Sequence, residues 1–130
     1  MSADAYLMSA ERHPHGAAAV AELFADHPHV ESRVGDWQDV MRTAGPFDVL
    51  CMDTTLQVDL QPTQWDRITA LIKVGGQIVM DDLTPVELWP TEWDECIDLK
   101  REFAFANPRV VSTEVRTTPT TAALIVRRRQ

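Results

Sequence analysis

The chain has 130 residues, of which 45% are hydrophobic, and a formal net charge of −8. This length suits a single domain with one core, and the acidic charge disfavours nucleic-acid binding through a basic face, because such a chain repels phosphate. No apolar stretch is long enough to cross a membrane, and Cys51 and Cys96 are too few for a disulfide framework. We therefore expect one cytoplasmic domain over residues 1–130 that binds neither nucleic acid nor membrane.

The N-terminal third alternates between strand-like and helix-like patterns. A short apolar run predicts a strand over residues 4–9, and an Ala-rich stretch with one apolar face predicts a helix over 15–26. Alternating residues predict a second strand over 30–34. Asp36 follows this strand and can cap a weak helix over 37–43.

The middle of the chain predicts a strand, a helix and another strand. Residues 47–53 form an apolar run that ends in a carboxylate, and residues 63–73 carry a helical pattern. A glycine pair at 75–76 turns the chain into a second apolar run, which stops at Asp81 and Asp82. Continuous apolar runs of this kind are typical of strands that are buried on both faces of a sheet.

The C-terminal part predicts one more helix and a hairpin. A capping-box pattern from Thr91 to Asp94 predicts a helix that begins there and runs to about Phe105. Residues 109–115 and 122–128 are two strand-like runs joined by a Thr- and Pro-rich turn. Their spacing predicts an antiparallel hairpin.

The order of these elements is β-α-β-α-β-α-β-α-β-β, which predicts an α/β fold. The alternation implies a mostly parallel sheet with helices on both faces, finished by the C-terminal antiparallel hairpin. Trp65 and Trp93 lie on apolar helical stripes, so we expect both side chains in the core rather than at a ligand.

Acidic side chains follow each of the first two predicted strands, at the end where open α/β sheets bind ligands. Glu11 can accept both hydroxyls of a nucleoside ribose, or it can be an exposed acid that the dipole of the next helix stabilises. Asp36 can accept the amine of adenine while Trp37 covers the ring, or the two can be a helix cap and a core side chain. The residues alone leave these alternatives open.

Three further carboxylates end the two strands in the middle of the chain: Asp53, Asp81 and Asp82. Because these strands are expected to be parallel neighbours, their carboxylates can converge at one edge of the sheet. With no Lys or Arg nearby, such carboxylates repel one another unless a cation or protons neutralise them, and hard oxygen ligands suit Mg²⁺, Ca²⁺ or Mn²⁺. The alternative is that the three acids are solvated loop residues.

Together these segments resemble the class I S-adenosylmethionine-dependent methyltransferases, especially the small-molecule O-methyltransferase-like branch. The resemblance covers nearly the whole chain and depends on the order and spacing of the motifs rather than on any single one. The motifs are Glu11 after the family's second strand, Gly35-Asp36-Trp37 after the third, residues 47–53 as the fourth strand, residues 71–82 as the end of a helix and the fifth strand, and the closing hairpin that ends at 124–127.

The resemblance implies a Rossmann-like methyltransferase fold and methyl transfer from S-adenosylmethionine to an oxygen of a small molecule. Glu11 would bind the ribose of the cofactor, and Asp36 with Trp37 would bind the adenine. Asp53 would lie near the methionine part of the cofactor, where the resemblance makes it the candidate catalytic residue.

The resemblance also assigns a metal site. In the metal-dependent, catechol-type members, three positions that bind a divalent cation match Asp53, Asp81 and Asp82. A cation such as Mg²⁺ there orients a substrate hydroxyl and lowers its pKa, so that an oxyanion meets the methyl group in line. Those members carry a lysine base three residues after the first aspartate, where this chain has Leu56.

One part of the family pattern is missing from the sequence. The chain starts at what resembles the family's second strand, so the first, central strand and its Gly-rich cofactor loop are not present. This leaves three accounts open: a fragment of a methyltransferase, a rearranged or strand-exchanged fold, and a degenerate, non-catalytic domain that acts in partner or nucleotide binding. An exposed central strand edge favours self-association, so we expect a homodimer.

Overall fold

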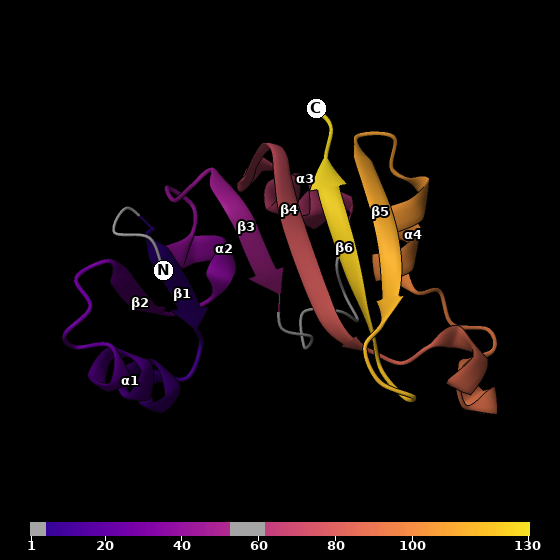
Figure 1. The fold of residues 1–130 in the computed structure, drawn as a ribbon, viewed down its shortest axis with the longest axis horizontal. Helices are drawn as coiled ribbons and strands as arrows, with labels where there is room; N and C mark the ends of the chain where they lie inside the picture. Colours follow the sequence, from indigo (N-terminus) through magenta and orange to yellow (C-terminus); the bar gives the residue numbers. More distant parts are fainter. Residues whose placement is uncertain (1–4, 53–61) are drawn as a thin grey trace. The chain divides into compact units, whose positions relative to one another are not determined.

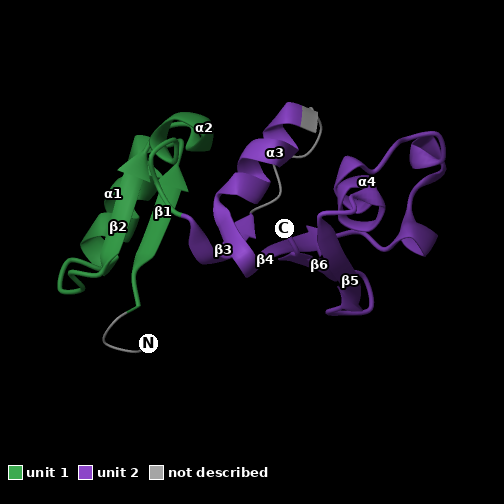
Figure 2. Cartoon of the chain, turned by 90° about the horizontal axis from the view of Figure 1, so that it is seen from above, with its two compact units in different colours: residues 1–45 green, residues 46–130 purple. Residues whose placement is uncertain are grey.

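The computed structural model describes residues 5–52 and 62–130, and the chain forms two compact units, residues 1–45 and 46–130 (Figure 2). Each unit has its own sheet (Figure 1). The expected single domain therefore stays a prediction. Asp53 and Leu56, which the sequence singled out, lie outside the described residues.

Unit 1 (residues 1–45) is a βαβ unit followed by a short helix. Strands β1 (Leu7–Glu11) and β2 (Val30–Val34) pair in parallel, and α1 (Pro14–Leu23) connects them. The last turn before unit 2 is α2 (Trp37–Val40). The strand predicted over residues 4–9 is found at Leu7–Glu11 instead, because these residues form the parallel ladder with Val30–Val34. Glu11 is therefore the last residue of β1 rather than the residue after it.

Unit 2 (residues 46–130) contains a four-stranded mixed sheet in the order β3-β4-β6-β5. β3 (Phe47–Met52) pairs in parallel with β4 (Ile72–Leu83), which pairs antiparallel with β6 (Ala122–Arg128). β5 (Val110–Arg116) and β6 form the predicted antiparallel hairpin. A parallel pair with an antiparallel hairpin at its side confirms the expected sheet.

Both longer helices of unit 2 lie on the same face of its sheet. α3 (Pro62–Ala70) and α4 (Leu99–Ala106) appear behind the sheet in Figure 1 and together on one side of it in Figure 2. Trp65 of α3 stacks on Phe103 of α4 with ring centroids 4.1 Å apart, and Trp65 is only 6% exposed, which confirms its predicted core position. The strand residues beneath the helices are at most 1% exposed: Ile72, Ile78, Met80, Leu124 and Val126.

The helix predicted from Thr91 to Phe105 is wrong in its first half. Thr91–Trp93 forms a single 3-10 turn (η3), as Val86–Leu88 does (η2), and the α-helix begins at Leu99. Asp98 caps this helix, because its Oδ1 accepts two backbone N–H groups at 3.1 Å. Trp93 is consequently not in the core but 43% exposed.

The glycine pair lies inside β4 and not before it. β4 begins at Ile72, and its pairing with β3 shifts register between Phe47 and Val49. Gly75 takes a positive φ of 84°, and a Cβ on Gly76 would lie 2.6 Å from Ile72 Cγ2 and 2.9 Å from the Asp48 carbonyl oxygen. The two glycines therefore form a β-bulge within the sheet, where the sequence had predicted a turn before the strand.

We expect Gly76→Ala to lower the free energy of unfolding by about 2 kcal/mol, because the new methyl group meets backbone that cannot move without breaking the β3–β4 ladder. Urea unfolding followed by circular dichroism measures this. Gly16→Ala is the matched control: its close atoms belong to the flexible Glu11 side chain, and alanine favours the α1 helix. Equal losses in the two variants would contradict the bulge.

No helix in the described part of the chain is both long and apolar enough to span a membrane.

Candidate functional site

The first group of candidate residues lies at the carboxyl end of the β1–β2 sheet in unit 1. The Glu11 carbonyl accepts the Gly35 N–H at 2.9 Å, so the turns after the two strands are joined there. Glu11 Oε1 accepts the His13 N–H at 2.8 Å, which holds the carboxylate beside the start of α1. A Cβ on Gly16 would lie 3.2 Å from the Glu11 carboxyl carbon, so glycine makes room for this acid.

Asp36 performs the capping role that the sequence offered as one alternative. Its Oδ1 accepts the Gln38 N–H at 2.9 Å, and its Oδ2 accepts Arg12 Nη2 at 2.9 Å. Trp37, the first residue of α2, is half-buried, and its indole Nε1 is buried without a hydrogen-bond partner among the described residues. A buried N–H without a partner is costly, so this donor is a position where a ligand acceptor would be favourable.

The second group lies at the carboxyl ends of β3 and β4 in unit 2. A cavity of about 400 Å³ opens there, lined by Cys51, Met52, Val79, Asp81 and Asp82. Both carboxylates are exposed, and Asp82 has a positive φ of 53°, the only such value among the described non-glycine residues. Aspartate tolerates this conformation better than most residues, and strained backbone of this kind concentrates at functional sites.

The predicted three-carboxylate metal site stays a prediction. Asp81 and Asp82 share the cavity, but Asp53 lies outside the described residues. Within residues 5–52 and 62–130, no three His, Cys, Asp or Glu side chains come together as a potential metal site.

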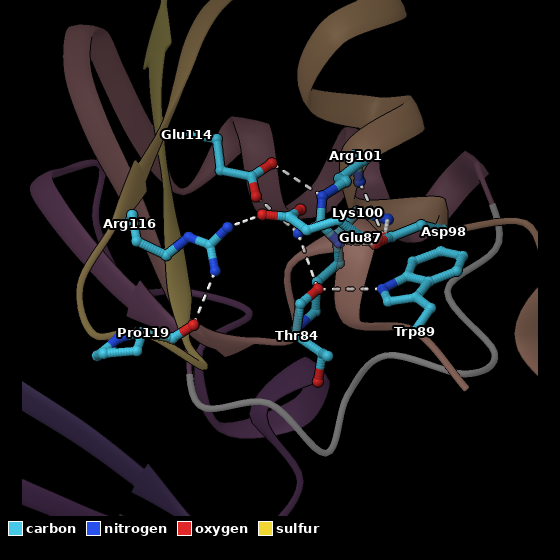
Figure 3. A network of polar contacts seen from close by, with 9 residues as sticks. All are labelled: Thr84, Glu87, Trp89, Asp98, Lys100, Arg101, Glu114, Arg116 and Pro119. Atoms are coloured by element: carbon cyan, nitrogen blue, oxygen red, sulfur yellow. Dashed lines mark hydrogen bonds and ion pairs between the residues drawn. The ribbon is translucent and has the colours of Figure 1, made fainter.

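An arginine network that the sequence did not reveal fixes the segment after Asp82 (Figure 3). The Thr84 carbonyl accepts the Trp89 indole N–H at 3.0 Å and Arg101 Nη2 at 3.1 Å. Arg101 also lies over the Trp89 ring, with its guanidinium carbon 5.9 Å from the ring centroid. The chain that leaves the cavity is thereby tied to α4.

Arg101 extends this network to the hairpin. Its Nε and Nη2 donate to the two Glu114 oxygens at 2.9 and 2.8 Å, and its Nη1 pairs with Asp98, the cap of α4. Glu114 lies on β5, so one guanidinium joins the helix, the hairpin and the segment after β4. Hydrogen bonds from Arg101 hold the pKa of Glu114 below its ordinary value.

We expect Glu114→Gln to destabilise the protein most at neutral pH. Because the folded-state pKa of Glu114 is lowered, its ion pair stabilises the fold above the unfolded-state pKa and loses this effect as the pH falls through the folded-state pKa. Chemical unfolding of wild type and variant between neutral and acidic pH measures the difference, which should shrink toward acid. Glu95→Gln, the same change on an exposed segment, is the control.

A difference between wild type and Glu114→Gln that stayed constant with pH would contradict this assignment. The helix predicted from Thr91 to Phe105 placed Arg101 in its interior, so the sequence offered no signal for the pair. It gave no indication that the partner lies 13 positions later on β5.

Solved structures identify the fold. A methyltransferase from Geobacter sulfurreducens superposes with a TM-score of 0.71 over 96% of this chain, at 13% sequence identity. A cofactor-bound protein from MTB superposes with a TM-score of 0.75 over 99% of this chain, at 17% identity. This chain has the class I methyltransferase fold. It covers 59% and 64%, respectively, of the lengths of those two proteins.

A third structure with the methyltransferase fold contains a cofactor product. The N-methyltransferase NodS from Bradyrhizobium japonicum WM9, in complex with S-adenosyl-L-homocysteine, matches 96% of this chain with a TM-score of 0.68 and 12% identity, and this chain covers 67% of it. Further matches include proteins described as rRNA methylases and as O-methyltransferases, so the fold leaves the acceptor open. No protein-family model matches the sequence, and no curated protein matches it.

The strand pairing agrees with the methyltransferase fold without its first strand. β1 pairs with β2 and β3 pairs with β4, and among the described residues no strand joins β1 to β3. In the arrangement implied by the resemblance, the first strand would pair on both sides.

Proposed function

We propose that this chain acts in methyl transfer from S-adenosylmethionine to an oxygen of a small molecule. The observation that supports it most is the position of Glu11 at the carboxyl end of β1, joined to the turn that carries Asp36 and Trp37. In open α/β sheets this edge is where nucleotide cofactors bind. Because the described chain has the methyltransferase fold, we infer that the cofactor bound at this edge is S-adenosylmethionine.

The residues of unit 1 fit an adenosine group chemically. A carboxylate oxygen has two lone-pair directions, so Glu11 can accept ribose hydroxyls while Oε1 keeps its bond to the His13 N–H. The Trp37 indole N–H lacks a partner in the described part of the chain and can donate to a ligand acceptor. Asp36 is already engaged by Arg12 and by the α2 backbone. An adenine amine would therefore compete with Arg12 for Oδ2.

The residues at the ends of β3 and β4 are assigned to the reacting groups. S-adenosylmethionine supplies an electrophilic methyl group on a cationic sulfonium, and carboxylates favour such a cation electrostatically. Asp81 and Asp82 line the cavity there, and Asp53 follows β3 in the sequence. In this proposal a carboxylate takes the proton that the acceptor hydroxyl loses as its oxygen binds the methyl group.

We expect S-adenosylhomocysteine to bind the purified chain at one site, and Glu11→Gln to weaken binding at least about tenfold, because a neutral amide is a poorer acceptor for ribose hydroxyls. Isothermal titration calorimetry measures both. Glu22→Gln, an exposed acid of α1, removes the same charge and should bind like wild type. A folded protein that binds no S-adenosylhomocysteine would overturn the proposal.

We also propose that a divalent cation such as Mg²⁺ binds at Asp53, Asp81 and Asp82. If so, Mg²⁺ should raise the affinity for S-adenosylhomocysteine plus a catechol acceptor, since the cation holds the acceptor hydroxyls. The gain should disappear in Asp81→Asn, which removes one anionic ligand. The same gain in wild type and Asp81→Asn would place the cation elsewhere.

One observation favours a second candidate, a non-catalytic domain that binds a partner. Among the described residues, the helices α3 and α4 both lie on one face of the unit 2 sheet, which leaves the other face for contact with a partner (Figure 2). The calorimetric titration separates the candidates, because a pure interaction domain would not bind S-adenosylhomocysteine.

A further inference from the structure

In the described part of unit 2, one face of the four-stranded sheet has no helix packed on it. Residues directly opposite one another in a ladder share a face, and the register joins Cys51 to Val79, Val79 to Ile125, and Ile125 to Thr113. The same alternation adds the neighbours two positions away on each strand. We call the result the open face. Its apolar residues are Val49, Cys51, Val79, Val111, Val115, Ala123 and Ile125, and its polar residues are Gln77, Thr113 and Arg127.

Most of the open face is apolar, and several of its apolar side chains are accessible to solvent. Val49 is 54% exposed, Val111 44% and Val115 42%, whereas Ile78, Met80, Leu124 and Val126 on the helix side are at most 1% exposed. Helices α3 and α4 both lie on that other side (Figures 1 and 2). Parallel strand pairs are normally covered on both faces, because their residues are apolar on both. The open face is therefore a surface that favours a covering partner.

The open face is large enough for a specific interface. Four strands at about 4.8 Å spacing and six residues at about 3.3 Å give a flat area of about 400 Å². Apolar patches of this size on soluble proteins mark interaction sites. Two such faces total about 800 Å² by this flat measure, and side-chain relief raises the accessible area above that value, so the pair falls at the weak end of specific interfaces.

The charges on the open face select both the partner and its orientation. The whole chain carries a net charge of −8, yet the ladder positions on this face carry no carboxylate. Arg127 and Gln77, paired in the ladder, lie at one end of the face. Asp81 and Asp82 lie at the other end, where they share a cavity with Cys51. The face is thus apolar in the middle, basic at one end and acidic at the other.

We propose that two copies of this chain dimerise by packing open face against open face with their strands antiparallel. A two-fold axis perpendicular to the strands places Arg127 of each copy over the Asp81 end of the other, which pairs opposite charges. The other two-fold arrangement, with strands parallel, sets Arg127 against the partner's Arg127 and is repulsive. Face-to-face sheet packing about 10 Å apart is a common architecture, and two-fold dimers are the commonest oligomers.

Sedimentation velocity on the full chain tests this dimer without reference to cofactor binding. We expect a species of twice the 14.6 kDa chain mass at about 100 μM protein, and Val111→Lys should raise the dissociation constant at least about tenfold. The matched control is Phe105→Lys, which adds the same charge at a 57% exposed apolar residue of α4, on the helix side. This control should dimerise like wild type.

A charge exchange tests the orientation. Arg127→Glu should weaken the dimer, and Arg127→Glu combined with Asp81→Arg should restore it, because the two ends then attract again with opposite signs. Circular dichroism confirms that each variant is folded. A monomeric wild type would overturn the proposal, as would equal effects of Val111→Lys and Phe105→Lys. A stronger dimer in Arg127→Glu would refute the antiparallel arrangement.

Discussion

Strand β4 organises unit 2, because among the described strands it alone has a parallel partner on one side and an antiparallel partner on the other. Its inward residues, Ile78 and Met80, are at most 1% exposed and lie under the two helices. The bulge at Gly75 and Gly76 sets its register against β3. If this register slipped by one residue, the apolar side chains of β4 would turn to the wrong face. The cavity at its carboxyl end would be lost with them.

The candidate site depends on how each strand ends. Glu11 closes β1 beside the start of α1, and the segment after Asp82 is tied by Thr84 to Arg101 and Trp89. The ion pair between Arg101 and Glu114 stabilises the fold more than an exposed ion pair would. The Arg101 side chain is mostly buried, and it donates two charge-assisted hydrogen bonds to Glu114. It holds the exit from the cavity while touching neither of its carboxylates. Rigid support of this kind is what a binding site needs.

Two features leave this fold open to association. β1 and β3 each have one strand partner among the described residues, and the unit 2 sheet has helices on one face. At its other edge the same sheet is better protected, because β5 carries Glu114 and Arg116. Apolar surface without such protection costs free energy in water, and pairing with a second copy removes that cost.

Local patterns alone determined the order of strands and helices, the β2 and hairpin segments, the burial of Trp65 and the Asp36 cap, since each depends on neighbouring residues. The helix expected from Thr91 begins only at Leu99, where Asp98 accepts the Lys100 and Arg101 N–H groups and so caps the first turn. Tertiary structure decided which face the helices cover, where the glycine bulge lies and that Arg101 meets Glu114. These depend on contacts between distant segments, and side-chain periodicity within one segment carries no information about them.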